Sequence, residues 1–160
     1  MEKEKEVDLA KRVEKSVELF KAGFNCSQSV FAAFADMYGI PQEQALKLSA
    51  SFGGGIGRMR QTCGAACGLF MLAGLETGST EGGDREKKMN NYHTVQELAE
   101  ELRKKNGSII CSELLGLNKA QENASFVPEE RTDAYYKKRP CAKIIEETSA
   151  LWVKYLINKK

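Results

Sequence analysis

The sequence predicts one all-α domain over residues 1–160, a compact bundle of about six or seven helices. Apolar residues recur at spacings of three and four with charges between them, which is typical of amphipathic helices. Glycine and proline interrupt this pattern where helices are expected to end or begin. We find no convincing pair of strands. A chain of 160 residues is long enough for one domain with its own core.

The first third of the chain predicts three helices. The first should stop near Gly23. Asn25 is a suitable N-cap, and Gln28 three residues later completes a capping-box pattern, so a second helix should begin there and end at Gly39. Residues 41–52 should form the third helix, because the proline at position 41 suits a first helical turn.

The remaining predicted elements are a loop at 53–57, a helix at about 59–76, a break at 78–84, helices at about 84–105 and 109–116, and a last helix at about 140–157. Residues 117–139 are polar, and we assign no helix to them.

The stretch "CGAACG" at 63–68 places two glycines inside a predicted helix. Each interior glycine costs about 1 kcal/mol relative to alanine, so another interaction must offset that cost. Without side chains, Gly64 and Gly68 allow a second backbone or a cofactor to come close. The alternative is tight helix–helix packing, with Cys63 and Cys67 acting as small hydrophobic residues.

Four of the five cysteines are predicted to lie in or near a first helical turn. Cys26 follows the predicted N-cap, Cys111 follows Ser108 by three residues, Cys141 follows a proline, and Cys63 follows the glycine loop. Unpaired N–H groups and the helix dipole at such positions favour a thiolate and lower its pKa. Four such placements suggest that helix starts converge to hold the thiols together.

Composition restricts the function. An odd number of cysteines argues against a fully paired disulfide framework and fits thiol chemistry or metal ligation better. The first fifteen residues are mixed in charge without an apolar signal core, so we expect a cytoplasmic protein. A formal charge of +2 favours neither nucleic acid nor an acidic membrane surface. The longest apolar stretch, 65–75, is too short to insert across a bilayer.

These cysteines and their surroundings resemble the C_GCAxxG_C_C family, whose members are classed as redox-active. The resemblance rests on a CGAxxG motif at 63–68, on "NCSQSVFAAF" and "SFGGGIGRM" before it, and on "GSIICSELLG" after it. It covers roughly residues 14–156 and implies four family cysteines, which are Cys26, Cys63, Cys111 and Cys141. The motif glycines Gly64 and Gly68 would contact the bound group. Cys67 fills a variable position of the motif.

The resemblance implies a redox or electron-transfer protein that acts with an oxidoreductase or electron-transfer partner. In the first interpretation, Cys26, Cys63, Cys111 and Cys141 ligate an iron–sulfur cluster, because four thiolates are the usual ligand set. In the second, the protein performs thiol–disulfide chemistry without metal: Cys63 attacks, and Cys141 or Cys26 resolves. In the third, the chain is a non-enzymatic binding protein with a structural zinc site. The oligomeric state is left open.

Three other features favour ordinary roles. The glycine loop at 53–57 lacks the Gly-Lys-Ser/Thr ending of a phosphate loop. Arg58 and Arg60 could balance the charge of a thiolate or cluster, although solvated arginines are commoner. His93 is expected at the surface.

A disulfide between Cys63 and Cys67 is disfavoured, because residues at i and i+4 of a helix hold their Cβ atoms about 5–6 Å apart.

Overall fold

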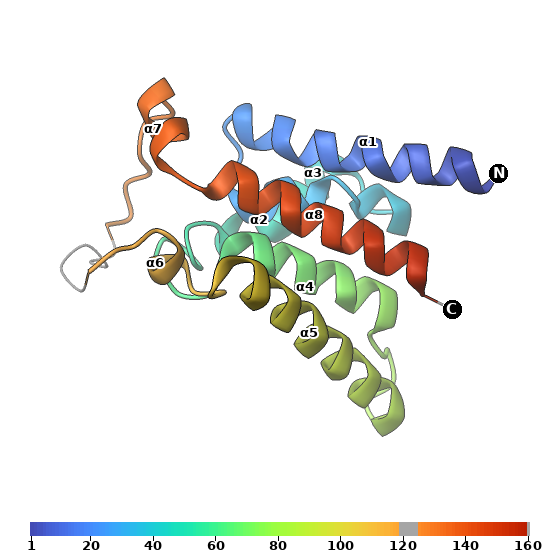
Figure 1. Cartoon of the computed structure of the whole chain (residues 1–160). Coiled ribbons are helices and arrows are strands. Elements are labelled where there is room, and N and C mark those ends of the chain that lie inside the picture. Colours follow the sequence, from blue (N-terminus) through green and yellow to red (C-terminus); the bar gives the residue numbers. More distant parts are fainter. Residues whose placement is uncertain (119–124, 160) are drawn as a thin grey trace.

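The computed structural model describes residues 1–118 and 125–159. Within these ranges the chain forms eight α-helices and two short 3₁₀ helices (Figure 1). In chain order they are α1 (Glu2–Lys21), α2 (Cys26–Ala32), η1 (Ala35–Tyr38), α3 (Gln42–Ser49), η2 (Ala50–Phe52), α4 (Gly64–Thr77), α5 (Arg85–Asn106), α6 (Cys111–Leu114), α7 (Asp133–Lys138) and α8 (Cys141–Asn158). The all-α prediction is confirmed, since β pairing in the described ranges is limited to one bridge between Thr62 and Ile110.

The predicted capping box at the start of α2 is confirmed. Asn25 Oδ1 accepts a hydrogen bond from the Gln28 amide at 2.9 Å, and Gln28 Oε1 accepts one from the Asn25 amide at 3.0 Å. The Asn25 side chain also donates to the carbonyl oxygen of Ala50 at 2.9 Å. These bonds fix Cys26 as the first residue of α2 and hold that helix start against η2.

The bundle is built around α4. Helices α1 and α8 run side by side, while α4 packs against α2, α5 and α8 (Figure 1). A buried hydrogen bond of 2.8 Å from Ser149 Oγ to Ser16 Oγ joins α8 to α1. Trp152 of α8 is fully buried in the core. None of the helices in the described part of the chain has the length and apolar character needed to span a bilayer.

Helix α4 begins later than the sequence predicts. The helix expected from about residue 59 starts at Gly64, and residues 53–62 form a loop instead. The backbone φ angles of Ile56, Arg58 and Arg60 are +66°, +61° and +62°, which a right-handed helix does not allow. The loop is closed by its own hydrogen bonds, such as the Arg58 amide to the Gly53 carbonyl at 3.2 Å.

The second helix also ends earlier than expected, at Ala32, and the 3₁₀ helix η1 fills the stretch before Gly39. A further difference is α7, which forms inside the stretch 117–139 to which we assigned no helix. Thr132 caps it, accepting a hydrogen bond from the Tyr135 amide at 3.2 Å. This short helix brings the total above the expected six or seven. Residues 119–124 of that stretch lie outside the described residues.

Gly68 explains how closely α2 and α4 pack. A Cβ atom at Gly68 would lie 2.9 Å from the carbonyl oxygen of Ser27 and 3.3 Å from the amide nitrogen of Phe31. The neighbour on this face is therefore the backbone of α2, as the helix-packing interpretation predicted. Gly74, also in α4, has no such neighbour within 4 Å.

We predict opposite effects for two glycine-to-alanine substitutions in this helix. Gly68→Ala should lower the free energy of unfolding by up to about 2 kcal/mol, because overpacking against a backbone outweighs the gain in helix propensity. Gly74→Ala should raise it by up to about 1 kcal/mol. Urea unfolding followed by circular dichroism measures both changes. Equal stabilisation by the two substitutions would contradict the close packing at Gly68.

Candidate functional site

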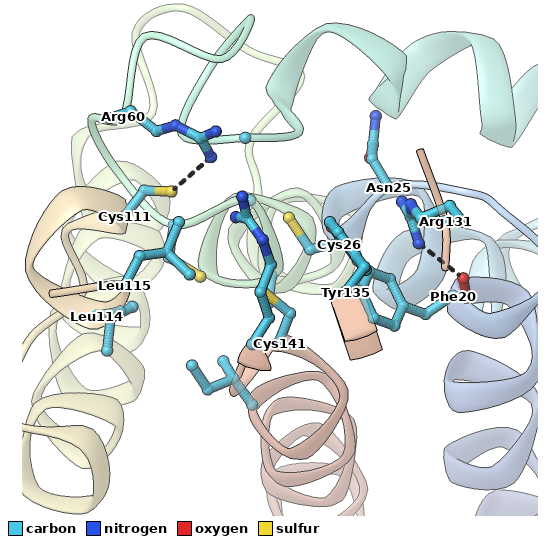
Figure 2. Close-up of a pocket in the computed structure, with 16 residues that line it drawn as sticks. Phe20, Asn25, Cys26, Arg60, Cys111, Leu114, Leu115, Arg131, Tyr135 and Cys141 are labelled. Carbon is cyan, nitrogen blue, oxygen red and sulfur yellow. Dashed lines mark hydrogen bonds between the residues drawn. The ribbon is translucent and has the colours of Figure 1, made fainter. Parts of the chain in front are cut away.

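The four cysteines that the resemblance selects line one cavity. Cys26, Cys63, Cys111 and Cys141 all border a space of about 60 Å³. A volume of about 10–15 Å³ holds one water, so this space can hold a group larger than a single water molecule. Figure 2 shows Cys26, Cys111 and Cys141 around this space on three different segments of the chain.

Each of these cysteines stands at the start of a different helix, as predicted. Cys26, Cys111 and Cys141 are the first residues of α2, α6 and α8. Cys63 is the N-cap residue of α4. The four helix starts therefore meet at one place, and the chain contributes its thiols to it from widely separated positions.

A backbone clamp brings the segments before α4 and α6 together. Thr62 pairs with Ile110 in an antiparallel bridge. The Cys63 amide donates to the carbonyl oxygen of Ile109 at 2.7 Å, and the Cys111 amide donates to that of Gln61 at 2.6 Å. Both cysteines are thus fixed through their own backbone amides.

Two glycines make room for the thiols. A Cβ atom at Gly64 would lie 2.4 Å from Cys26 Sγ and 2.9 Å from the carbonyl oxygen of Phe52. A Cβ at Gly55, where φ is +75°, would lie 2.6 Å from the Cβ of Cys111. The close approach predicted at Gly64 is therefore made by a thiol. Gly64 also borders the cavity, so its contact with a bound group stays a prediction.

Three arginines line the same cavity, and none of its lining residues within the described ranges is a carboxylate. Arg60 Nη1 lies 3.8 Å from Cys111 Sγ. Arg131 donates a hydrogen bond of 3.0 Å to the carbonyl oxygen of Phe20 in α1 (Figure 2). It donates a second, also of 3.0 Å, to that of Phe24 just after the helix. Arg139 is the third. The cavity therefore combines the positive charge of three arginines with four cysteine thiols.

The sequence analysis missed Arg131, Tyr135 and Arg139, which all line the cavity. The guanidinium carbons of both arginines lie 4.9 Å from the centre of the Tyr135 ring, so the three side chains form one stack. Tyr135 lies in α7, whereas Arg131 precedes this helix and Arg139 follows it, so no local pattern in the sequence indicates that the three side chains meet. Arg60, by contrast, was singled out as a possible charge partner and lines the site.

The prediction that helix starts lower the thiol pKa values is wrong for three of these cysteines. Burial raises the pKa of Cys63 and of Cys111, and it raises that of Cys141 to about 12. The backbone amides of Ala65 and Ala66 do lower the pKa of Cys63, but desolvation of the charged form outweighs them. These three thiols are therefore protonated at neutral pH in the absence of a bound cation.

Cys67 and His93 lie apart from this arrangement. Cys67 is buried, does not line the cavity, and directs its sulfur toward the carbonyl oxygen of Thr62 at 3.9 Å. Burial raises its pKa to about 11. His93 is exposed and lies 3.0 Å from Glu97, as expected for a surface residue. All five cysteines are free thiols, including the Cys63 and Cys67 pair.

The four cysteines supply the type of ligand needed by a group that is bound through thiolates. They do not form a preformed site for a single metal ion in the described part of the chain. Four cysteines are the ligand set of common iron–sulfur clusters and of some zinc sites. Yet among residues 1–118 and 125–159, no three histidine, cysteine or acidic side chains are grouped so as to hold a metal ion. The four thiols surround the cavity but do not converge on a single point within it.

Comparisons with known proteins agree with the motif. Residues 24–155 match the family described as "Putative redox-active protein (C_GCAxxG_C_C)". This range includes all five cysteines and every residue that lines the thiol cavity except Phe20. No curated protein and no solved structure shows a significant match to the chain.

We predict that the reduced, metal-free protein loses stability in alkaline solution. An unfolded cysteine ionises near pH 8.5, whereas folded Cys141 ionises near 12, so the unfolded state gives up its proton first. The free energy of unfolding should fall as pH rises above about 8.5, by up to about 1.4 kcal/mol per pH unit for each such thiol.

Urea unfolding between pH 7 and 10.5 under anaerobic reducing conditions measures this loss. Cys141→Ser keeps the side-chain size but removes the titration, so its stability should decline less steeply than that of the parent. Lysine and tyrosine side chains titrate in the parent and in Cys141→Ser alike, so their effects on stability cancel when the two proteins are compared. Parallel declines would contradict the raised pKa of Cys141.

Proposed function

Because this chain belongs to the C_GCAxxG_C_C family, described as redox-active, we propose that Cys26, Cys63, Cys111 and Cys141 ligate an iron–sulfur cluster. The observation that supports the proposal most is that these four thiols, from four helix starts, line one cavity. A cluster bound there would supply one-electron transfer. The protein would then exchange electrons with an oxidoreductase or electron-transfer protein.

The arrangement of the four thiols around one cavity supports a cluster as the bound group in preference to a single zinc ion. A zinc ion binds sulfur at about 2.3 Å, so four tetrahedral sulfurs would lie about 3.8 Å from one another. No three potential ligands of the described chain are grouped in this way. In a cluster the thiolates are distributed over more than one iron, so the sulfurs surround a larger volume. A ring of thiols around a cavity is the arrangement that such a group needs.

The charges of the site support ligation by thiolates. Four thiolates in a buried cavity repel one another, and Arg60, Arg131 and Arg139 offset this repulsion. Arg60 is the arginine in contact with a sulfur, that of Cys111. Since burial raises the pKa of Cys63, Cys111 and Cys141, a bound metal must displace the protons of these thiols, and this displacement makes binding tighter as pH rises.

The metal-free thiol–disulfide alternative receives less support. A thiol attacks as its thiolate, and burial raises the pKa of Cys63, the expected nucleophile. Desolvation also disfavours the thiolate of Cys141, one of the two expected resolving residues. At neutral pH both would react slowly unless the site opened.

The ligand assignment predicts a pattern of single substitutions. Cys26→Ala, Cys63→Ala, Cys111→Ala and Cys141→Ala should each lose most of the bound iron, because three thiolates leave one iron without its ligand. Cys67→Ala, whose side chain lies outside the cavity, should keep it. Iron and acid-labile sulfide are measured after anaerobic reconstitution, together with visible absorbance and free-thiol counts.

Three outcomes would reject the assignment. Equal iron loss in Cys67→Ala and Cys63→Ala would make Cys67 a ligand. Colourless preparations with one zinc per chain would favour the structural-zinc alternative. No metal in any variant, with reversible loss of two thiols on oxidation, would favour thiol–disulfide chemistry.

A second prediction perturbs the site without removing a cysteine. Gly64→Ala adds a methyl group whose carbon would overlap Cys26 Sγ. The thiol of Cys26 must therefore move. We expect less iron per chain, although all five thiols remain countable after unfolding. Gly74→Ala, in the same helix with open space around it, is the matched control and should load normally. Normal loading of Gly64→Ala would show that Cys26 does not need its present position.

A further inference from the structure

A second cavity, here called the outer cavity, adjoins the thiol cavity and shares part of its lining. Its volume is about 310 Å³, and it is bordered by the loop at 53–60 and by residues of the segment 126–139. The two cavities share Arg60, Arg131, Arg139 and Tyr135 as lining residues. Arg58 and Glu129 line only the outer one.

The outer cavity is strongly positive. Four arginines and one glutamate supply the charged groups among its described lining residues. The arginines are close enough to affect one another: burial lowers the pKa of Arg58, and the positive charges of Arg60 and Arg139 lower it further. The side chains of Arg58 and Arg139 are only 20% and 16% exposed, so water screens this repulsion poorly.

Glu129 offsets part of this charge. Its Oε1 atom lies 3.6 Å from Arg58 Nη2 and also pairs with Arg139. Its side chain is 48% exposed, so it can swing into solvent. Arg60 and Arg131 have no carboxylate partner among the described residues. The cavity therefore keeps an excess of guanidinium groups without acidic partners in that part of the chain.

We propose that the outer cavity binds a small oxyanion of phosphate or sulfate type, or a ligand that carries such a group. Guanidinium groups present paired N–H donors that match the oxygens of an oxyanion. Arg58 and Arg60 come from the glycine loop, while Arg139 precedes α8, so a bound anion would be held from two sides. Glu129 occupies two of these arginines when the anion is absent and competes with it.

The limited exposure of the arginines decides between a small ligand and a protein surface. Side chains that are four-fifths buried around a cavity can be reached by a small anion but not by the acidic side chains of a large docking surface. Arg58 and Glu129 border only the outer cavity, so variants of these two residues test the anion site separately from the four cysteines.

The test is calorimetric titration with inorganic phosphate in low-salt buffer, with chloride at equal ionic strength as the reference. The parent should bind one phosphate per chain. Arg58→Gln should weaken binding by about tenfold or more, because it removes a charge-assisted hydrogen bond. Glu129→Gln should tighten binding several-fold, because the competing carboxylate is gone. Both variants should load iron as the parent does.

Arg85→Gln is the matched control, since it removes one positive charge at the start of α5, far from α6 and α7 (Figure 1). It should leave phosphate affinity unchanged. Equal weakening by Arg58→Gln and Arg85→Gln would overturn the proposal, because only overall charge would then matter. The absence of saturable phosphate binding in both the parent and Glu129→Gln would also overturn it, whether or not the thiols bind iron.

Discussion

The close packing of α2 against α4 is the constraint on which the thiol cavity depends. Gly64 and Gly68 lie one turn apart, and each has a part of α2 where its own side chain would be. At Gly68 that part is backbone, and at Gly64 it is the sulfur of Cys26. The same contact thus fixes the distance between the helices and places the first thiol beside Cys63. The helix-propensity cost of two interior glycines is offset by this packing.

Burial of the thiols has two opposing effects on the chemistry of the cavity. It keeps the unliganded thiols of Cys63 and Cys141 neutral, which makes them poor nucleophiles and keeps the core free of repelling charges. It also means that any group bound by thiolates must displace protons in a region of low dielectric. The arginines that line the cavity lower the electrostatic cost of replacing these protons with a bound group. Arg60 lowers the pKa of Cys111, although burial still dominates there.

Local signals predicted most of the helices and placed four cysteines at helix starts, where the structure has them. The capping box at Asn25 and the proline before Cys141 marked two helix starts correctly. What the sequence could not predict was long-range: the bridge between Thr62 and Ile110, and the packing of Arg131 under the end of α1. Local reasoning also misjudged the thiol pKa values, since a helix start is visible in the sequence but the depth of burial is not. The left-handed residues of the loop at 53–60 have no propensity signal outside their glycines.

The positions of the four cysteines determine when the cavity can exist during synthesis. Cys26 is in the second helix, whereas Cys141 begins the last one, which completes the bundle by packing along α1. A nascent chain without α8 has the glycine contact and three of the thiols, but one wall of the cavity is missing. Because α8 supplies one wall, the pocket closes only after α8 has been synthesised and has packed along α1. Any group held by all four sulfurs is therefore acquired after the rest of the domain has been made.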